Sequence, residues 1–142
     1  MKVINKSYYD LPKYETAGAV GMDVRAFLDN KVTLESLGIV IIPTGLYVEV
    51  PEGFELQVRS RSGLAAKFGV SVCNSPGCID PDYRGEIKVI LTNSSKNEYI
   101  VNPGERIAQL ILSPIKKFTW ELVEVLTETV RGESGLGSSG KN

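Results

Sequence analysis

Residues 46–59 read Leu46-Tyr47-Val48-Glu49-Val50-Pro51-Glu52-Gly53-Phe54-Glu55-Leu56-Gln57-Val58-Arg59. On both sides of the turn residues 51–53, apolar side chains occupy every second position. A period of two puts these side chains on one face of an extended chain, which is the pattern of half-buried β-strands. The stretch therefore predicts a β-hairpin with strands at 46–50 and 54–58 and one buried face.

Other β-rich runs lie on both sides of this stretch, at residues 38–42, 70–73, 86–92, 99–101, 107–112 and 118–126. Clusters of Gly, Pro, Asn, Asp and Ser separate these runs, as turns do. The only plausible helix covers residues 64–68, with Ser62 as its expected N-cap and Gly69 as its expected end. Many short strands with frequent turns predict an all-β sandwich, jelly roll or barrel with one short helix.

The length of 142 residues and the balance of 42% hydrophobic and 23% charged residues fit one globular domain. We expect this domain to span residues 1–130, because composition changes only after that point. Residues 131–142 contain four glycines and three serines. Such a segment lacks the apolar side chains needed to pack itself, so it predicts a flexible arm.

The net charge of −1 provides no basic field for long nucleic acid, so no nucleic-acid partner is expected. Neither a signal peptide nor a run long enough to cross a membrane is visible, and the chain is expected to be cytoplasmic. The absence of histidine excludes Ser–His and Cys–His mechanisms and imidazole zinc sites. Cys73 and Cys78 are expected to be reduced thiols, with a disulfide across their turn as the alternative.

Polar residues that could serve a small anionic ligand occur in five segments. Arg61 and Ser62 precede the short helix, where free N–H groups suit phosphate. Asp80 is a credible base for activating water in a chain without histidine, and Gln109 lies in an apolar run and needs a polar partner. Each segment alone also fits a structural role, such as a cap, a turn or a tail. The segments are 17–26, 59–65, 74–88, 103–111 and 131–140.

Taken in this order, the five segments resemble the five motifs of the homotrimeric dUTP pyrophosphatases (dUTPases). The resemblance runs from about residue 15 to residue 140. It implies a β jelly roll of the dUTPase (β-clip-like) type, a homotrimer, and active sites between subunits that use segments of all three chains. The most specific pieces are Arg61-Ser62-Gly63, Ile79-Asp80 with Tyr83-Arg84-Gly85, and Arg131-Gly132 with Gly135, Gly137 and Ser138.

The resemblance also implies roles at matching positions. Asp80 resembles the acid that orients the attacking water, and Tyr83 the residue that packs on the deoxyribose and excludes a 2′-hydroxyl. Gln109 resembles a residue supporting the water and phosphate region, and Asp23 the acid that reaches Mg²⁺ through water. The remaining matches fall in three groups: uracil-reading Asn74, Cys78 and Ile79, with Lys88 as a further substrate contact; phosphate-binding Arg61, Ser62 and Gly63; and the closing arm with Arg131, Leu136, Gly137 and Ser138.

By this resemblance the chain would hydrolyse dUTP to dUMP and pyrophosphate with Mg²⁺, by in-line attack of water on the α-phosphorus. That reaction supplies dUMP for thymidylate synthesis and keeps uracil out of DNA. One departure is Leu136, where the family usually has Phe stacking on uracil. Two rival interpretations are a dCTP deaminase, whose Ser-Ser-x-Ala-Arg pattern is absent, and a dUTPase-like binding or regulatory protein, suggested only by Leu136.

Overall fold

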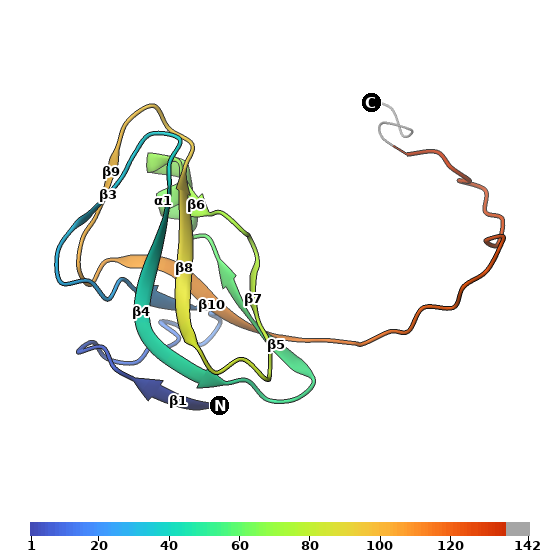
Figure 1. Ribbon diagram of the computed structural model, residues 1–142, viewed down its shortest axis with the longest axis horizontal. Coiled ribbons are helices and arrows are strands. Elements are labelled where there is room, and N and C mark those ends of the chain that lie inside the picture. Colours follow the sequence, from blue (N-terminus) through green and yellow to red (C-terminus); the bar gives the residue numbers. More distant parts are fainter. Residues whose placement is uncertain (136–142) are drawn as a thin grey trace.

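The body of the molecule is built from short strands and one helix, and the computed structural model describes residues 1–135 (Figure 1). The alternating apolar positions of the sequence become the inward faces of these strands. The elements are β1 (Lys2–Asn5), β2 (Met22–Arg25), β3 (Val32–Leu34), β4 (Ile39–Glu49), β5 (Phe54–Arg59), α1 (Ser62–Phe68), β6 (Val70–Val72), β7 (Gly77–Ile79), β8 (Glu86–Asn93), β9 (Tyr99–Val101) and β10 (Arg106–Pro114). The expected all-β fold with one short helix is confirmed.

Two four-stranded sheets enclose the core, in the orders β1-β4-β8-β6 and β2-β10-β5-β7. A small third sheet, β3-β9, lies at the end of the body where α1 also lies (Figure 1). All strand pairs within these sheets are antiparallel. The core between the sheets is almost wholly aliphatic, and its largest fully buried apolar side chains are Leu34, Ile42, Ile87, Leu91 and Ile107.

The hairpin predicted from residues 46–59 is wrong. β4 pairs with β1 and β8, whereas β5 pairs with β10 and β7, so the two strands belong to different sheets. Val48 and Val50 on one strand and Leu56 and Val58 on the other are all buried in the same core. Alternation predicts the buried face correctly, but it cannot distinguish strands that pair side by side from strands that face each other across a core.

The expected strands at 38–42 and 46–50 form one long strand, β4, with an irregular register between Pro43 and Tyr47. Gly45 allows this irregularity, because its φ of +71° is in the left-handed region. A Cβ on Gly45 would lie 2.7 Å from the backbone nitrogen of Ser7. Thr44 stabilises this irregular part of β4 against β8, since its Oγ1 donates a hydrogen bond to the carbonyl of Ile87 at 2.6 Å.

The helix begins earlier in the sequence than expected. Ser62 is its first residue and not its cap: Arg61 occupies the N-cap position, without a side-chain capping hydrogen bond. The expected end at Gly69 is confirmed, because its N–H bonds to the carbonyl of Ala65 in a left-handed C-cap. Throughout residues 1–135, no helix has the length and apolar character needed to cross a membrane.

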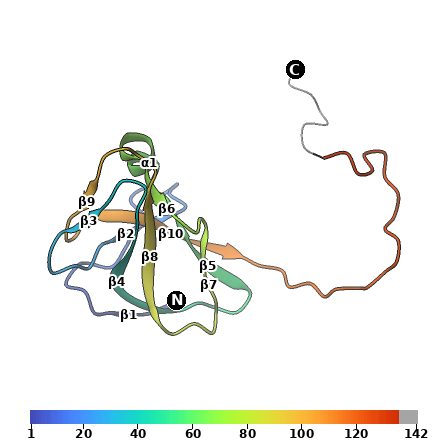
Figure 2. The same ribbon diagram turned by 45° about the horizontal axis from the view of Figure 1, so that its top comes forward.

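The strand expected at 118–126 does not form. After β10 the chain runs away from the body in an extended path (Figures 1 and 2). Large apolar side chains here are open to solvent, with Trp120 89% and Leu122 99% exposed. A strand needs a neighbouring strand edge to satisfy its backbone hydrogen-bonding groups. This segment extends away from the strands of the body, so no edge within residues 1–135 pairs with it. We call residues 118–126 the apolar arm.

Candidate active site

A largely buried carboxylate forms the centre of a polar cluster on the second sheet. β2 and β10 pair so that Asp23 lies directly opposite Gln109. The Nε2 of Gln109 donates a hydrogen bond to Oδ1 of Asp23 at 3.1 Å, and only 11% of the Asp23 side chain is exposed. Gln109 therefore has the polar partner that its place in an apolar run demanded.

Two arginines hold the same carboxylate. Arg61 makes a two-point contact, with Nε 3.2 Å from Oδ1 and Nη2 3.1 Å from Oδ2 of Asp23. Nη1 of Arg106 lies 3.1 Å from Oδ2. One carboxylate between two guanidinium groups leaves one positive charge in excess. The cluster of Asp23, Arg61, Arg106 and Gln109 is therefore suited to an anionic ligand with several oxygens.

The first turn of α1 adjoins this cluster, because Ser62 and Gly63 directly follow Arg61. Both residues are exposed, and the first N–H groups of a helix have no acceptor within the helix. A Cβ on Gly63 would meet no atom within 4 Å, so the surface beside it is open. The first, second and fourth segments of the sequence thus come together in one place.

The third segment forms a corner between the sheets. Here β6 pairs with β8 in one sheet, whereas β7 pairs with β5 in the other. Asn74 and Cys78 are exposed on this corner, and Ile79 is half-buried. The pKa of the Cys78 thiol is raised above its ordinary value, first by hydrogen bonding to the Glu55 carboxylate and then by burial. Cys73 and Cys78 are both free, as expected.

Asp80 and Tyr83 lie in the loop between β7 and β8. The backbone N–H of Tyr83 bonds to the carbonyl of Asp80 at 3.2 Å, which forms a tight turn. The Tyr83 hydroxyl donates to the carbonyl of Glu86 at 3.0 Å, and its ring occupies the space that a Cβ on Gly85 would need. The Asp80 carboxylate is exposed and has no hydrogen bond or ion pair to any residue in 1–135. Lys88, just inside β8, is exposed as well.

The structure does not bring Asp80 to the Asp23 cluster. Asp23 lies opposite Gln109, which lies opposite Arg59 on β5. Ile79, next to Asp80, pairs with Leu56, three residues farther along β5. Three strand spacings across the sheet and three residues along it separate the two groups by roughly 15–20 Å. Figure 1 agrees, because α1 and the β7–β8 loop lie at opposite ends of the body.

The fifth segment begins on the extended chain beyond the apolar arm. Arg131 is exposed, and its Nε donates to the carbonyl of Ser134 at 2.9 Å. Leu136, Gly137 and Ser138 lie outside the described residues. The single chain therefore presents three separate groups: the Asp23 cluster, the Asp80–Tyr83 turn and Arg131.

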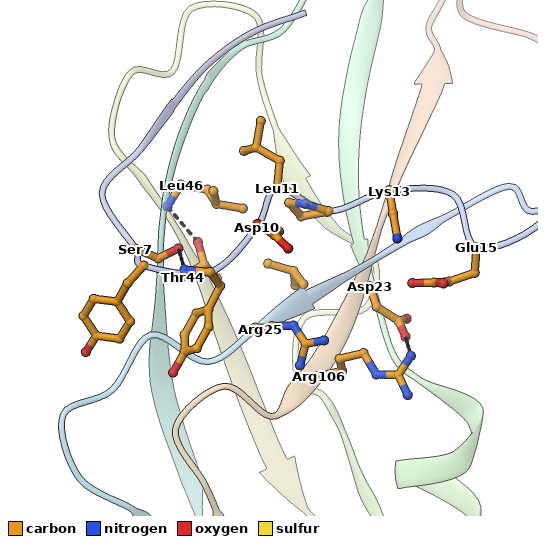
Figure 3. A pocket seen from close by; sticks show the side chains of 14 residues that line it. Ser7, Asp10, Leu11, Lys13, Glu15, Asp23, Arg25, Thr44, Leu46 and Arg106 are labelled. Atoms are coloured by element: carbon orange, nitrogen blue, oxygen red, sulfur yellow. Dashed lines mark hydrogen bonds and ion pairs between the residues drawn. The ribbon is translucent and has the colours of Figure 1, made fainter.

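A cavity of about 650 Å³ opens beside Asp23 (Figure 3). Asp23 and Arg106 form a pair at its edge, with Arg25 next to them, and Lys13 and Glu15 lie on the same side (Figure 3). The sequence motifs alone do not single out Arg106. Its signal was the adjacent apolar pair Ile107-Ala108, which breaks the alternation of the strand at that point.

The residues present suit a metal ion that arrives with phosphates. In the described part of the chain, no group of three or more Asp, Glu, Cys or His side chains could hold a metal ion by itself. Both oxygens of Asp23 already accept hydrogen bonds from the surrounding donors. Mg²⁺ in nucleotide enzymes typically keeps several waters and takes its other ligands from phosphates. Contact with Asp23 through water is consistent with that arrangement.

Two four-stranded antiparallel sheets around one core place the chain among the jelly-roll-like β proteins, and its cationic cluster beside the start of a helix suits a phosphorylated small molecule. The sequence model of the dUTPase family matches residues 7–140. The deoxyuridine 5′-triphosphate nucleotidohydrolase of Fusobacterium nucleatum is 52% identical over 141 residues, covering 99% of this chain and 97% of the relative. The chain belongs to the dUTPase family, and it is therefore an enzyme.

Solved structures agree with the fold. A mutant of the Staphylococcus bacteriophage 80alpha dUTPase, determined with dUpNHpp, matches with a TM-score of 0.86 at 27% identity and covers 98% of this chain and 97% of that one. A mutant dUTPase from phage phi11 of S. aureus, described with a structural Mg(II) ion, matches with a TM-score of 0.78 over 89% of this chain and 98% of that one. At 23% identity, this second likeness concerns the fold alone.

Proposed function

We propose that this enzyme hydrolyses dUTP to dUMP and pyrophosphate. The observation that carries the proposal is the convergence of three distant motif segments on Asp23, which Arg61 contacts at two points and Gln109 at one. The same three positions are the ones at which the sequence resembles the phosphate and metal region of dUTPases. The name of the Fusobacterium nucleatum relative supports the same substrate.

Arg61, Ser62 and Gly63 bind the phosphates in this proposal. Arg61 uses three of its five N–H groups on Asp23 and on the carbonyl of Arg106, which leaves two for a ligand. The Ser62 hydroxyl and the first N–H groups of α1 add neutral donors beside it. Mg²⁺, held by the phosphates and by water near Asp23, would supply neutralisation of their charge.

The corner at residues 74–79 and the turn at residues 80–85 bind the nucleoside. Asn74 and the backbone of Cys78 and Ile79 read the uracil edge, and Lys88 is a further substrate contact. Tyr83 packs on the deoxyribose, and contact with Gly85 holds its ring in one orientation. A ring fixed in this way leaves no room for a 2′-hydroxyl, so UTP is a poor substrate.

Asp80 orients the attacking water and takes its proton. The oxygen of that water forms a bond to the α-phosphorus, the bond to the bridging oxygen breaks, and pyrophosphate leaves. The free Asp80 carboxylate suits this task, because it has no internal partner among residues 1–135 that would have to be displaced. Gln109 supports the site through its hydrogen bond to Asp23, and Arg131 stabilises charge on the phosphates.

The working form in this proposal is a homotrimer with active sites shared between subunits. One substrate cannot contact Asp80 and the Asp23 cluster of the same chain if they are roughly 15–20 Å apart, because the attacked phosphorus must lie within a few ångström of both. A second copy resolves this problem by supplying the missing half. Residues 131–142, with Leu136, Gly137 and Ser138, close over the bound phosphates from a third copy.

The physiological role that follows is to supply dUMP for thymidylate synthesis and to keep uracil out of DNA. The test is pyrophosphate release from dUTP, dCTP, dTTP and UTP, each with and without Mg²⁺. We expect release from dUTP alone, and dependence on Mg²⁺. Ammonia release from dCTP would instead favour the deaminase, and tight dUTP binding without turnover would favour a binding protein.

A further inference from the structure

A β-bulge interrupts the pairing of β10 with β2. Arg106 pairs with Arg25 and Ala108 with Val24, so two residues on β2 face three on β10. Ile107 and Ala108 are consecutive, and both are buried, at 1% and 0% exposure. Without the bulge, alternation back from Gln109 would turn Arg106 into the core. The bulge instead turns Arg106 to the outer face, beside Asp23.

Two contacts connect Arg106 with Arg61. The side chain of Arg106 shares Oδ2 of Asp23 with Nη2 of Arg61, each at 3.1 Å. The backbone carbonyl of Arg106 accepts a hydrogen bond from Nη1 of Arg61 at 2.9 Å. Arg61 is thus held on one side by a carboxylate and on another by a carbonyl. The second of these groups, the carbonyl of Arg106, lies at the bulge itself.

We propose that Arg106 is a positioning residue of the phosphate site: it fixes the Asp23 carboxylate, and through it the guanidinium of Arg61, in the orientation that binds the triphosphate. This inference rests on the proposed function. An arginine that merely solubilised the surface would not share an oxygen with Arg61 on a carboxylate that is 11% exposed.

Arg25 provides a matched control. It pairs with Arg106 across the bulge and lines the same cavity, and Figure 3 shows both side chains next to Asp23. Its Nη1 donates to the carbonyl of Gly104 at 2.7 Å, and it has no ion pair with Asp23. Arg25→Gln therefore removes the same charge from the same neighbourhood without touching the positioning contact.

The binding experiment measures the Kd of α,β-imido-dUTP, which is not cleaved, with Mg²⁺ present. We expect Arg106→Gln to raise this Kd about tenfold, Arg25→Gln less than about twofold, and Arg106→Lys to recover part of the loss. In a protein that already carries Asp23→Asn, Arg106→Gln should raise the Kd less than about twofold further, because the effect of Arg106 passes through Asp23. An equal rise in Kd for Arg106→Gln and Arg25→Gln would overturn the proposal. So would a rise for Arg106→Gln in the Asp23→Asn protein that is as large as in wild type.

A second measurement does not depend on nucleotide. The Nε–H of Arg61, which is bonded to Asp23, is followed by nuclear magnetic resonance in the free protein and assigned by its loss in Arg61→Lys. We expect faster solvent exchange of this proton in Arg106→Gln and wild-type exchange in Arg25→Gln. Unchanged exchange in Arg106→Gln overturns the proposal even if Asp23→Asn does not fold. If wild type fails to hydrolyse dUTP while this pattern holds, the proposed function fails and the positioning link survives.

Discussion

At the scale of single residues, the space beside Gly85 decides where Tyr83 lies. Any side chain at position 85 would overlap the tyrosine ring and hydroxyl. The ring is also anchored by its hydrogen bond to the carbonyl of Glu86. A glycine two residues away therefore sets the surface that the proposed sugar contact uses.

Gly85→Ala should displace the Tyr83 ring and weaken discrimination against ribonucleotides. We expect the ratio of kcat/KM for dUTP to that for UTP to fall about tenfold or more, because the tight fit against a 2′-hydroxyl is lost. Tyr83→Phe, which keeps the ring and loses only the hydroxyl contact, should change the ratio less. A ratio that stays at the wild-type value in Gly85→Ala would remove Tyr83 from sugar selection.

Asp80→Asn should lower kcat by about 10²–10⁴-fold, because the amide cannot take a proton from water. Binding of α,β-imido-dUTP should stay within a few-fold of wild type. Asp82→Asn, which changes a neighbouring acid in the same loop, is the matched control and should leave kcat nearly unchanged. Steady-state pyrophosphate release measures all three proteins, and near-normal turnover in Asp80→Asn would contradict the assigned role.

At the scale of elements, the irregular point in β4 joins two stretches that the sequence suggests are separate strands. Gly45→Ala should destabilise the fold by about 2–4 kcal/mol, from left-handed strain and from overlap with Ser7. Gly53→Ala separates the two causes, because Gly53 also has a positive φ but nothing within 4 Å of a Cβ. It should cost about 1–2 kcal/mol. Equal denaturation midpoints for the two variants would show that the overlap is relieved at no cost.

The sequence predicts most of the long strands and the position of the helix, because burial on one face leaves a period-two pattern. It does not predict which strands pair: residues 46–58 read as a hairpin, but their two strands join different sheets. The short strands β1, β3 and β7 have three or four residues, too few to show a period. Asp23, Arg61 and Gln109 could be chosen from composition and motif, but Arg106 could not, because a bulge changes its face.

At the scale of the whole molecule, the proposed trimer gives the apolar arm and the segment after it separate expected roles, the first in assembly and the second in turnover. Each large apolar side chain of the arm gains about 1.5–3 kcal/mol when a neighbouring surface covers it. A protein ending at Lys117 should therefore dissociate at far higher concentration than the full chain. A protein ending at Val130 keeps the arm, so it should stay assembled but lose turnover. Sedimentation, read in multiples of each protein's own chain mass (15.5 kDa for the full chain), and pyrophosphate release distinguish the two. Equal assembly of the two truncated proteins would exclude the arm from the interface.

The distance between Asp80 and the Asp23 cluster has a genetic consequence. In the proposed trimer, the alleles Asp80→Asn and Arg61→Gln would each lose nearly all activity, and they would damage different halves of the site. If one chain contributes Asp80 and another contributes Arg61, a mixed assembly contains some sites with both halves intact. Random mixing of equal amounts should restore about a quarter of the sites, since each half must come from the chain that retains it. Two inactive proteins, unfolded and refolded together, should then hydrolyse dUTP, whereas the same proteins refolded apart and mixed without exchange should not.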